Sequence, residues 1–187
     1  SNCLVTATRN PGLDHDRIAD RLHRIAGARE ILWVDGGGLL GDDTDGHIDQ
    51  LARFIDPENV VVAVSGDPHD PNHDGLEANH RLICQWATET SPKVNVHRLP
   101  IPAARFINDQ RVPESYCNFL RVGPDRLLVP SFGDRNSDDH AIGLLRELAR
   151  SATPQVEVLS LDCRDLIWGL GALHCASLNQ PARAQAS

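Results

Sequence analysis

The chain has 187 residues, 41% of them hydrophobic and 24% charged, and its formal net charge is −8. This composition is typical of a folded globular protein, and a chain of this length can bury roughly 70% of its unfolded surface around one core. We therefore expect a single domain over residues 1–187, with a disordered tail at 182–187. The acidic balance disfavours a nucleic-acid partner, because phosphate binding needs a basic face. No apolar run is long enough to span a membrane, so no membrane partner is expected.

Methionine and cysteine usage add two expectations. The chain contains no Met and begins with Ser1, so we expect a processed product or a piece of a longer protein. Its five cysteines form no CxxC pair, which excludes a zinc ribbon and disfavours a disulfide framework. A reducing, cytoplasmic setting is the simpler interpretation, with most thiols buried and one available as a nucleophile.

The predicted elements alternate between strands and helices. In the first half, apolar periodicity predicts strands at 4–6, 31–34 and 60–64 and helices at 14–26 and 76–89. The second half is predicted to contain a strand at 94–96, a surface connection at 100–113, strands at 116–122 and 126–129, a helix at 138–149 and a strand at 156–161. This alternation predicts an α/β protein.

One helix–strand–loop unit occurs twice in the sequence. Residues 16–35 match residues 139–162, with four extra residues in the second copy, and further on His47 matches His174. Such a repeat indicates pseudosymmetric modules whose equivalent loops converge on one end. Cys175 is one residue past the position equivalent to His47, so we expect these two side chains to meet. Chance similarity between two amphipathic units is the alternative.

Three polar motifs are only weak evidence for a nucleotide or metal site. The glycines of 36–41 fit a dinucleotide fingerprint, but the three aspartates that follow would repel a pyrophosphate. The stretch 42–46 looks like a calcium loop, but Gly41 and Ala52 stand where oxygen ligands are needed. His69 and His73 with neighbouring aspartates could hold a metal, but such loop residues more often face water.

Two short motifs carry candidate chemistry. His47 and Asp49 stand two residues apart, so in an extended segment both project to one side. There the imidazole can transfer protons and the carboxylate can hold a cation. Cys175 follows Gly169 and Gly171 in a loop and is a candidate exposed thiol, with a buried structural cysteine as the alternative.

Three separated stretches resemble the agmatine deiminase and bacterial-type peptidylarginine deiminase family of the guanidino-group-modifying superfamily. They are residues 41–49, residues 115–119 with 129–134, and residues 169–175 with 180–181. Arg9-Asn10-Pro11 is also similar to the family's Asn-Arg-Asn-Pro stretch. The family's run before His-Cys is Gly-Gly-Gly, whereas this chain has Gly169-Leu170-Gly171.

The resemblance implies an α/β-propeller of five pseudosymmetric ββαβ modules, of which about the last three are present. It implies that Cys175 is the nucleophile and His47 the general acid and base, with a substrate site at Asp49, Asp43 and Gly46. The family's Trp-x-Arg-Asp and Glu-Gly-Gly motifs, which supply a second guanidinium-binding Asp and a Glu, occur nowhere in these 187 residues. The resemblance implies no metal and no organic cofactor.

The implied reaction converts the guanidinium of agmatine to a ureido group through a covalent thiouronium on Cys175. The products are N-carbamoylputrescine, a precursor of putrescine, and ammonia. A protein-arginine deiminase acting on peptidylarginine is an alternative, and a catalytically incomplete fragment that only binds is another. The missing motifs predict low activity for this chain alone, and open module edges favour pairing into a homodimer.

Overall fold

The computed structural model of the protein describes residues 2–90 and 92–180, so the tail expected at 182–187 lies outside the described residues. Strands and helices alternate along these residues, which confirms the expected α/β class. None of the described helices has the length and apolarity that a membrane crossing requires.

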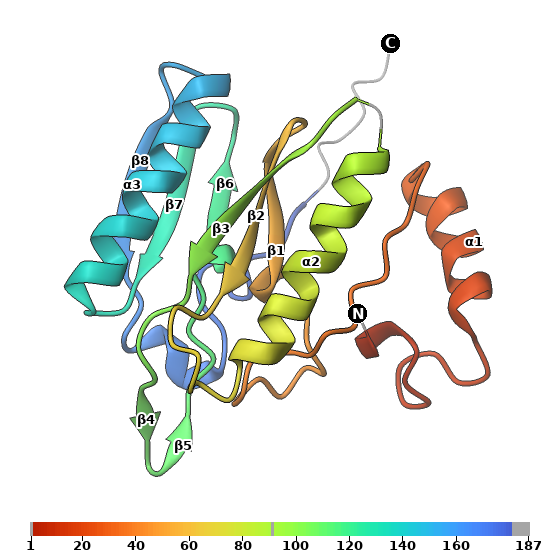
Figure 1. Ribbon diagram of the computed structural model, residues 1–187, viewed down its shortest axis with the longest axis horizontal. Coiled ribbons are helices and arrows are strands. Elements are labelled where there is room, and N and C mark those ends of the chain that lie inside the picture. Colours follow the sequence, from red (N-terminus) through yellow and green to blue (C-terminus); the bar gives the residue numbers. More distant parts are fainter. Residues whose placement is uncertain (1, 91, 181–187) are drawn as a thin grey trace.

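Two three-stranded sheets share one topology. In the first, β1 (Ala52–Asp56) pairs antiparallel with β2 (Asn59–Val64), and β2 pairs in parallel with β3 (Asn95–Pro100) across helix α2 (His73–Glu89). The second repeats this order and these pairings with β6 (Leu120–Val122), β7 (Arg126–Ser131), α3 (Arg135–Ala152) and β8 (Glu157–Asp162). Each unit is therefore a ββαβ module. Figure 1 shows the two modules side by side, with α1 (His15–Ala26) beyond the first.

The modules are held together by a shared helix. The central strand β2 is apolar because both of its faces are covered, and Val61 and Val62 are fully buried. Helix α3 contacts β7 and β8 of its own sheet and also β1 and β3 of the neighbouring sheet. Its buried residues Ala141 and Leu145 belong to the same core as Val61. Burial of one helix by two sheets therefore fixes one module against the next.

Capping residues mark both ends of helix α1 and the start of helix α3. The helix predicted at 14–26 is α1, with the Asp14 carboxylate accepting from the Arg17 N–H and Gly27 in the left-handed conformation at its end. Helix α3 begins three residues earlier than predicted, because Asp134 caps it by accepting from the Ser137 N–H. Helix α2 also begins earlier than predicted, at His73 rather than at residue 76, but without a side-chain hydrogen bond from its N-cap residue Asn72.

The N-terminal segment differs from the prediction. The strand predicted at 4–6 is absent from the described residues, where a 3-10 turn, η1 (Asn2–Leu4), occurs instead. Residues 31–34 are extended but join no sheet within the described part of the chain, so the strand prediction there was wrong. Val34 still packs against Val60, Val62 and Ile83 of the first module. Apolar burial, rather than strand pairing, explains the pattern of this segment.

Three further features of the chain differ from the prediction. Strand β1 was not predicted, and the surface connection at 100–113 contains a small hairpin, β4 (Phe106–Ile107) and β5 (Gln110–Arg111). The first half of the strand predicted at 116–122 is a 3-10 helix, η3 (Tyr116–Asn118). The Ser115 side chain accepts from the Cys117 N–H, and this cap favours a turn over a strand.

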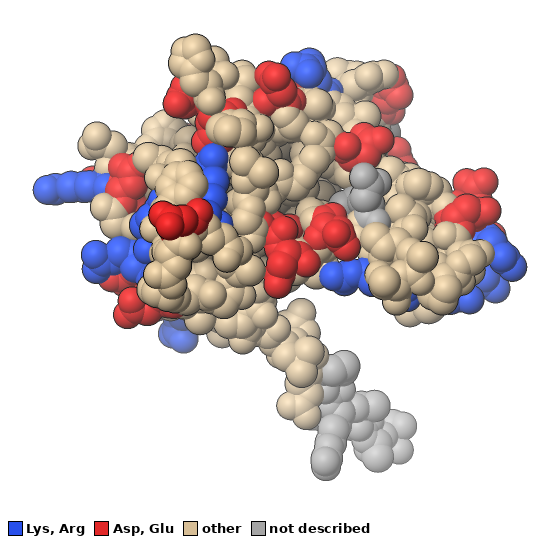
Figure 2. Space-filling view, turned by 90° about the horizontal axis from the view of Figure 1, so that it is seen from below, with Lys and Arg blue, Asp and Glu red and all other residues tan. Residues whose placement is uncertain are grey.

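The acidic balance of the chain is visible on its surface. Figure 2 shows the face below the view of Figure 1, with the lobe that contains α1 on the right. Asp and Glu side chains gather near the middle of this face, and most Lys and Arg side chains lie toward its edges.

Candidate active site

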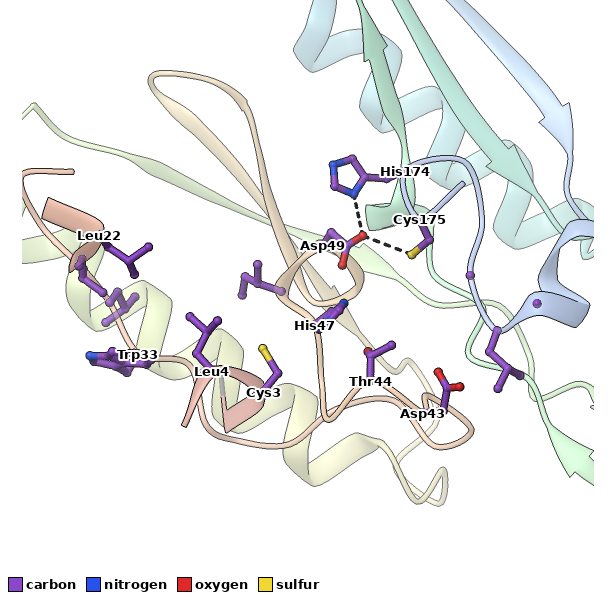
Figure 3. Close-up of a pocket in the computed structure, with 16 residues that line it drawn as sticks. Cys3, Leu4, Leu22, Trp33, Asp43, Thr44, His47, Asp49, His174 and Cys175 are labelled. Carbon is purple, nitrogen blue, oxygen red and sulfur yellow. Dashed lines mark hydrogen bonds and ion pairs between the residues drawn. The ribbon is translucent and has the colours of Figure 1, made fainter. Parts of the chain in front are cut away.

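A cavity of about 690 Å³ separates the N-terminal segment from the loops of the two modules. One wall is mainly apolar and contains Cys3, Leu4, Leu22 and residues 31–33. The opposite wall contains four of the predicted site residues, Asp43, His47, Asp49 and Cys175 (Figure 3). The fifth predicted site residue, Gly46, is not among the described residues that line the cavity.

Three loops that are far apart in the sequence meet at this wall. The first contains η2 (Ile48–Gln50), the second contains η3 after β3, and the third runs from η4 (Leu166–Gly169) to Cys175 after β8. The Ser115 hydroxyl donates to the Gln50 carbonyl at 2.7 Å and joins the first two loops. His47 and Cys175 line the same cavity, as the repeat predicts, but the segment after His47 is a 3-10 helix and not the expected extended strand.

Asp49 is the centre of the polar contacts. It is 9% exposed, and its Oδ2 atom lies 2.7 Å from His174 Nδ1, 3.0 Å from Asn118 Nδ2 and 3.4 Å from the Cys175 Sγ atom. Figure 3 shows the contacts with His174 and Cys175 as dashed lines. Burial acts to raise the pKa of Asp49. The hydrogen bonds from His174 and Cys175, with the charges of His174 and His47, outweigh burial and hold this pKa below its usual value. Asp49 is therefore an anion at neutral pH.

The Cys175 thiol is exposed, but Asn118 and Asp49 enclose its sulfur. Partial burial, followed by the nearby Asp49 carboxylate, raises the pKa of Cys175 above its ordinary value of 9.0. The hydrogen bond from Asn118 opposes these effects only in part. The thiol is therefore protonated at neutral pH.

Asn118 is a site residue that the sequence analysis did not assign. The side chain is fully buried, and its Oδ1 atom accepts from the backbone N–H groups of Ala172, His174 and Cys175 at 3.0–3.2 Å. Its Nδ2 atom donates to Asp49 and, at 3.1 Å, to the Cys175 sulfur. Asn118 thus ties the thiol loop to the carboxylate. The available signal was its place in the 115–119 motif, in a loop equivalent to the other two.

The two histidines of the cavity have different surroundings. His174 was matched to His47 by the repeat but was not assigned to the site, and its ring contacts Asp49. The His47 ring forms no hydrogen bond within the described part of the chain, although it lines the cavity and its charge acts on Asp49. Both nitrogens of His47 are therefore available to a ligand or a water molecule.

The acidic loop before His47 is organised by Asp42. Its carboxylate accepts from the backbone N–H groups of Thr44 and Gly46, each at 3.0 Å. Gly46 has a φ of +79° and passes close to Gly38, where a side chain would be strained. Gly46 thus shapes the turn, while Asp43 faces the cavity. A direct contact between Gly46 and a substrate stays a prediction.

The thiol loop is tightly packed on itself. A Cβ atom on Gly171 would lie 2.5 Å from the Cys175 Cβ and 2.9 Å from its sulfur. Leu170, which stands where the family has glycine, adopts a left-handed conformation with a φ of +60°. Such a conformation costs a non-glycine residue roughly 1–2 kcal/mol. The loop therefore tolerates the departure at residue 170 but has no space for one at residue 171.

Within residues 2–90 and 92–180, no group of three or more His, Cys, Asp or Glu side chains is arranged to hold a metal ion. His73, one of the two loop histidines considered above, begins helix α2, and its Nδ1 atom lies 3.2 Å from the Ser65 carbonyl oxygen. The expectation of no cofactor stays a prediction.

Known proteins are similar to this chain along nearly its whole length. The family model of the Porphyromonas-type peptidyl-arginine deiminase matches residues 1–181. The agmatine deiminase of Pseudomonas fluorescens (strain SBW25) is 31% identical over 198 residues, which cover 96% of this chain and 52% of that protein. The agmatine deiminase of Medicago truncatula is 28% identical, with the same coverage of both chains.

A solved structure shares the arrangement of the chain. The substrate-bound agmatine deiminase of C. jejuni, a Cys-to-Ser variant, superposes with a TM-score of 0.82 at 29% identity, and the match covers 93% of this chain and 49% of that one. The chain thus spans about half the length of the relatives it matches.

Proposed function

Because the chain belongs to the Porphyromonas-type peptidyl-arginine deiminase family, we propose that it carries the nucleophile-bearing half of an agmatine deiminase. The observation that carries this proposal is the contact of Asp49 and Cys175, which line one cavity with His47, with each other and with the buried Asn118 from a third loop. The agmatine deiminases named above are the relatives that favour agmatine as the substrate.

The fold supports this proposal through the packing of its modules. Helix α3 is buried between two sheets, and α2 is placed in the same way, with Ile83 packing against both Val34 and the first sheet. We propose that α1 and residues 31–34 are the second half of a third ββαβ module. The three units would then be successive blades of an α/β-propeller, with the equivalent loops at its centre.

Asp49 is suited to bind a guanidinium group. A planar guanidinium cation donates in parallel to the oxygens of a carboxylate, and such charge-assisted bonds are the strong ones. The partners of Asp49 use its Oδ2 atom, and no described residue donates to Oδ1. Asp43 adds a second negative charge on the same wall. The cavity therefore favours a small cation.

Substrate binding would also activate the thiol. Burial, and next the Asp49 anion, keep the pKa of Cys175 high. A bound guanidinium cation compensates that anion and stabilises a thiolate beside it, so the pKa of Cys175 falls when the substrate arrives. This order of events keeps the nucleophile protonated until a cation is in place.

The reaction then proceeds in two steps. His47 accepts the proton of the Cys175 thiol, and the resulting thiolate attacks the guanidinium carbon and forms a C–S bond. His47 donates a proton to the departing nitrogen, and ammonia leaves as the C–N bond breaks. The product is a thiouronium on Cys175. His47 next accepts a proton from water, whose oxygen attacks the same carbon, and the C–S bond breaks to release the ureido product and the thiolate.

The test compares two alkylating agents of the same shape. Chloroacetamidine is a planar cation, and chloroacetamide is its neutral analogue. Each forms a thioether with Cys175 and releases chloride. We expect the amidine to modify Cys175 at least tenfold faster, as measured by peptide mass mapping of the intact chain. Asp49→Asn should abolish this preference, and equal rates in the wild-type chain would overturn the proposal.

The substrate class is tested by ammonia release. Agmatine is compared with an N-acyl-arginine amide, which represents the peptidylarginine substrate in the description of the family model. Because the missing motifs predict low activity for this chain alone, we expect only slow release from agmatine, and none from a Cys175→Ser control. Release from the arginine amide alone would assign the site to peptidylarginine instead.

A further inference from the structure

Arg53 lies directly behind the site and holds the segment that contains Asn118. It is half-buried on strand β1, and its Nη1 atom donates to the Cys117 carbonyl at 3.4 Å and to the Phe119 carbonyl at 3.1 Å. The guanidinium carbon also lies 4.6 Å from the centre of the buried Phe119 ring. One side chain thus grips the backbone on both sides of Asn118.

The charge of Arg53 is not balanced by a direct ion pair. Among residues 2–90 and 92–180, no carboxylate forms a salt bridge with its guanidinium. Burial lowers the pKa of Arg53, and the negative charge of Asp49 acts against this effect, as would Cys117 and Cys175 if they were deprotonated. An arginine remains protonated even so, because its ordinary pKa is 12.5. At neutral pH the Asp49 anion is therefore the group of the site whose charge opposes this cation.

We infer that Arg53 is a positioning residue of this site, which fixes Asn118 through its neighbouring carbonyls and places a positive charge behind Asp49 and Cys175. The inference rests on the proposed role of Cys175 as the nucleophile. Arg53 does not line the cavity, so it would not touch the substrate. It acts through Asn118, whose amide contacts the thiol, and through its field on the developing thiolate.

Two substitutions separate the charge of Arg53 from its contacts. Arg53→Gln keeps an amide that can donate to one carbonyl but removes the positive charge. Arg53→Lys keeps the charge but loses the planar group that lies over Phe119. Arg121→Gln is the matched control, because Arg121 also donates to two backbone carbonyls, those of Ile55 and Pro124, but forms no hydrogen bond with the site loops in the described part of the chain.

The measurement is the rate of Cys175 alkylation by iodoacetamide as a function of pH, followed by peptide mass mapping. This readout requires no turnover, so it is independent of the substrate test above. We expect Arg53→Gln to move the inflection to higher pH and to slow alkylation about tenfold at pH 8, which corresponds to one pKa unit. Arg53→Lys should keep the inflection within a few tenths of a unit of wild type, and Arg121→Gln should not change it.

A profile of Arg53→Gln that coincides with wild type would overturn the inference. If circular dichroism shows that Arg53→Gln does not fold, Arg53→Lys decides. If the Cys175 alkylation profile of Arg53→Lys keeps the wild-type inflection, the charge of residue 53 is supported as the cause. If that inflection moves upward by a full pH unit, a role for the charge is contradicted. Failure of the amidine preference in the wild-type chain would instead reject the proposed function, whatever the behaviour of the Arg53 variants.

Discussion

Asn118 holds Cys175 by both of its polar ends: its Oδ1 atom accepts from the Cys175 N–H at 3.2 Å, and its Nδ2 atom donates to the Cys175 sulfur at 3.1 Å. The two contacts have different functions. The first fixes the backbone of the loop, and the second stabilises a thiolate. A substitution can therefore remove one function and leave the other.

Asn118→Asp should keep the loop but weaken the nucleophile. The carboxylate can still accept from the three backbone N–H groups, but it loses both donors and adds a negative charge beside Asp49 and Cys175. We expect the pKa of Cys175 to rise and its alkylation at pH 8 to fall at least tenfold. Asn118→Ala should also destabilise the fold, by about 2–3 kcal/mol, because buried N–H groups lose their acceptor.

The control for Asn118 is Asn79, another buried asparagine that joins two segments. Its side chain accepts from the Gly36 N–H and donates to the Gly37 carbonyl, away from the thiol. Asn79→Ala should lower the free energy of unfolding without changing the alkylation profile of Cys175. An Asn118→Asp variant with wild-type alkylation would show that its amide donors do not act on the thiol.

Asp49→Asn should have opposite effects on two reagents. The Asp49 carboxylate contributes to the raised pKa of Cys175, so its removal should lower that pKa. Alkylation by neutral iodoacetamide at pH 8 should then become several-fold faster, while the preference for chloroacetamidine is lost. The pH profile of iodoacetamide alkylation checks the sign, and an inflection that moves upward would contradict it.

Two glycines of the thiol loop provide a matched pair. A Cβ atom on Gly171 would collide with Cys175, whereas one on Gly169 would have no atom within 4 Å. We expect Gly171→Ala to cost about 1–3 kcal/mol of stability by overpacking and to move the thiol from Asn118. Gly169→Ala should match wild type in both thermal unfolding and alkylation. Equal behaviour of the two variants would mean that the loop is looser than its contacts indicate.

The five thiols should differ in reactivity at neutral pH. Cys175 is exposed, Cys84 is half-buried, and Cys3, Cys117 and Cys163 are buried. Burial also raises the pKa of Cys117 to about 12. Timed iodoacetamide labelling should therefore modify Cys175 first and Cys84 second. Faster labelling of Cys84 or Cys163 than of Cys175 would contradict the assignment of the nucleophile.

The local parts of the fold were predictable from the sequence. Helix α1 has its boundary signals at Asp14 and Gly27, and the apolar run of β2 identifies a strand buried on both faces. Residues 31–34 have a similar apolar pattern but no strand partner among the described residues. Strand pairing depends on whether another strand lies beside a segment, whereas an apolar pattern indicates only that the segment is buried.

The candidate site was also predictable from the sequence only in part. Sequence motifs led to His47, Asp49, Asp43 and Cys175, which the structure places on one wall. Asn118 was missed because its role consists of contacts with Asp49 and Cys175, which are 69 and 57 positions away from it in the sequence. The raised pKa of Cys175 was also not foreseen, since it depends first on the partial burial of its sulfur and then on the nearby Asp49 carboxylate.

The meeting of three loops means that no single module contains a complete site. Asp49, Asn118 and Cys175 come into contact only after the chain between residues 49 and 175 has reached its final arrangement. The reactivity of the Cys175 sulfur therefore reports whether the three loops of the site have come together. Labelling Cys175 during refolding would date the last step of folding, whereas helix content would report only the earlier ones.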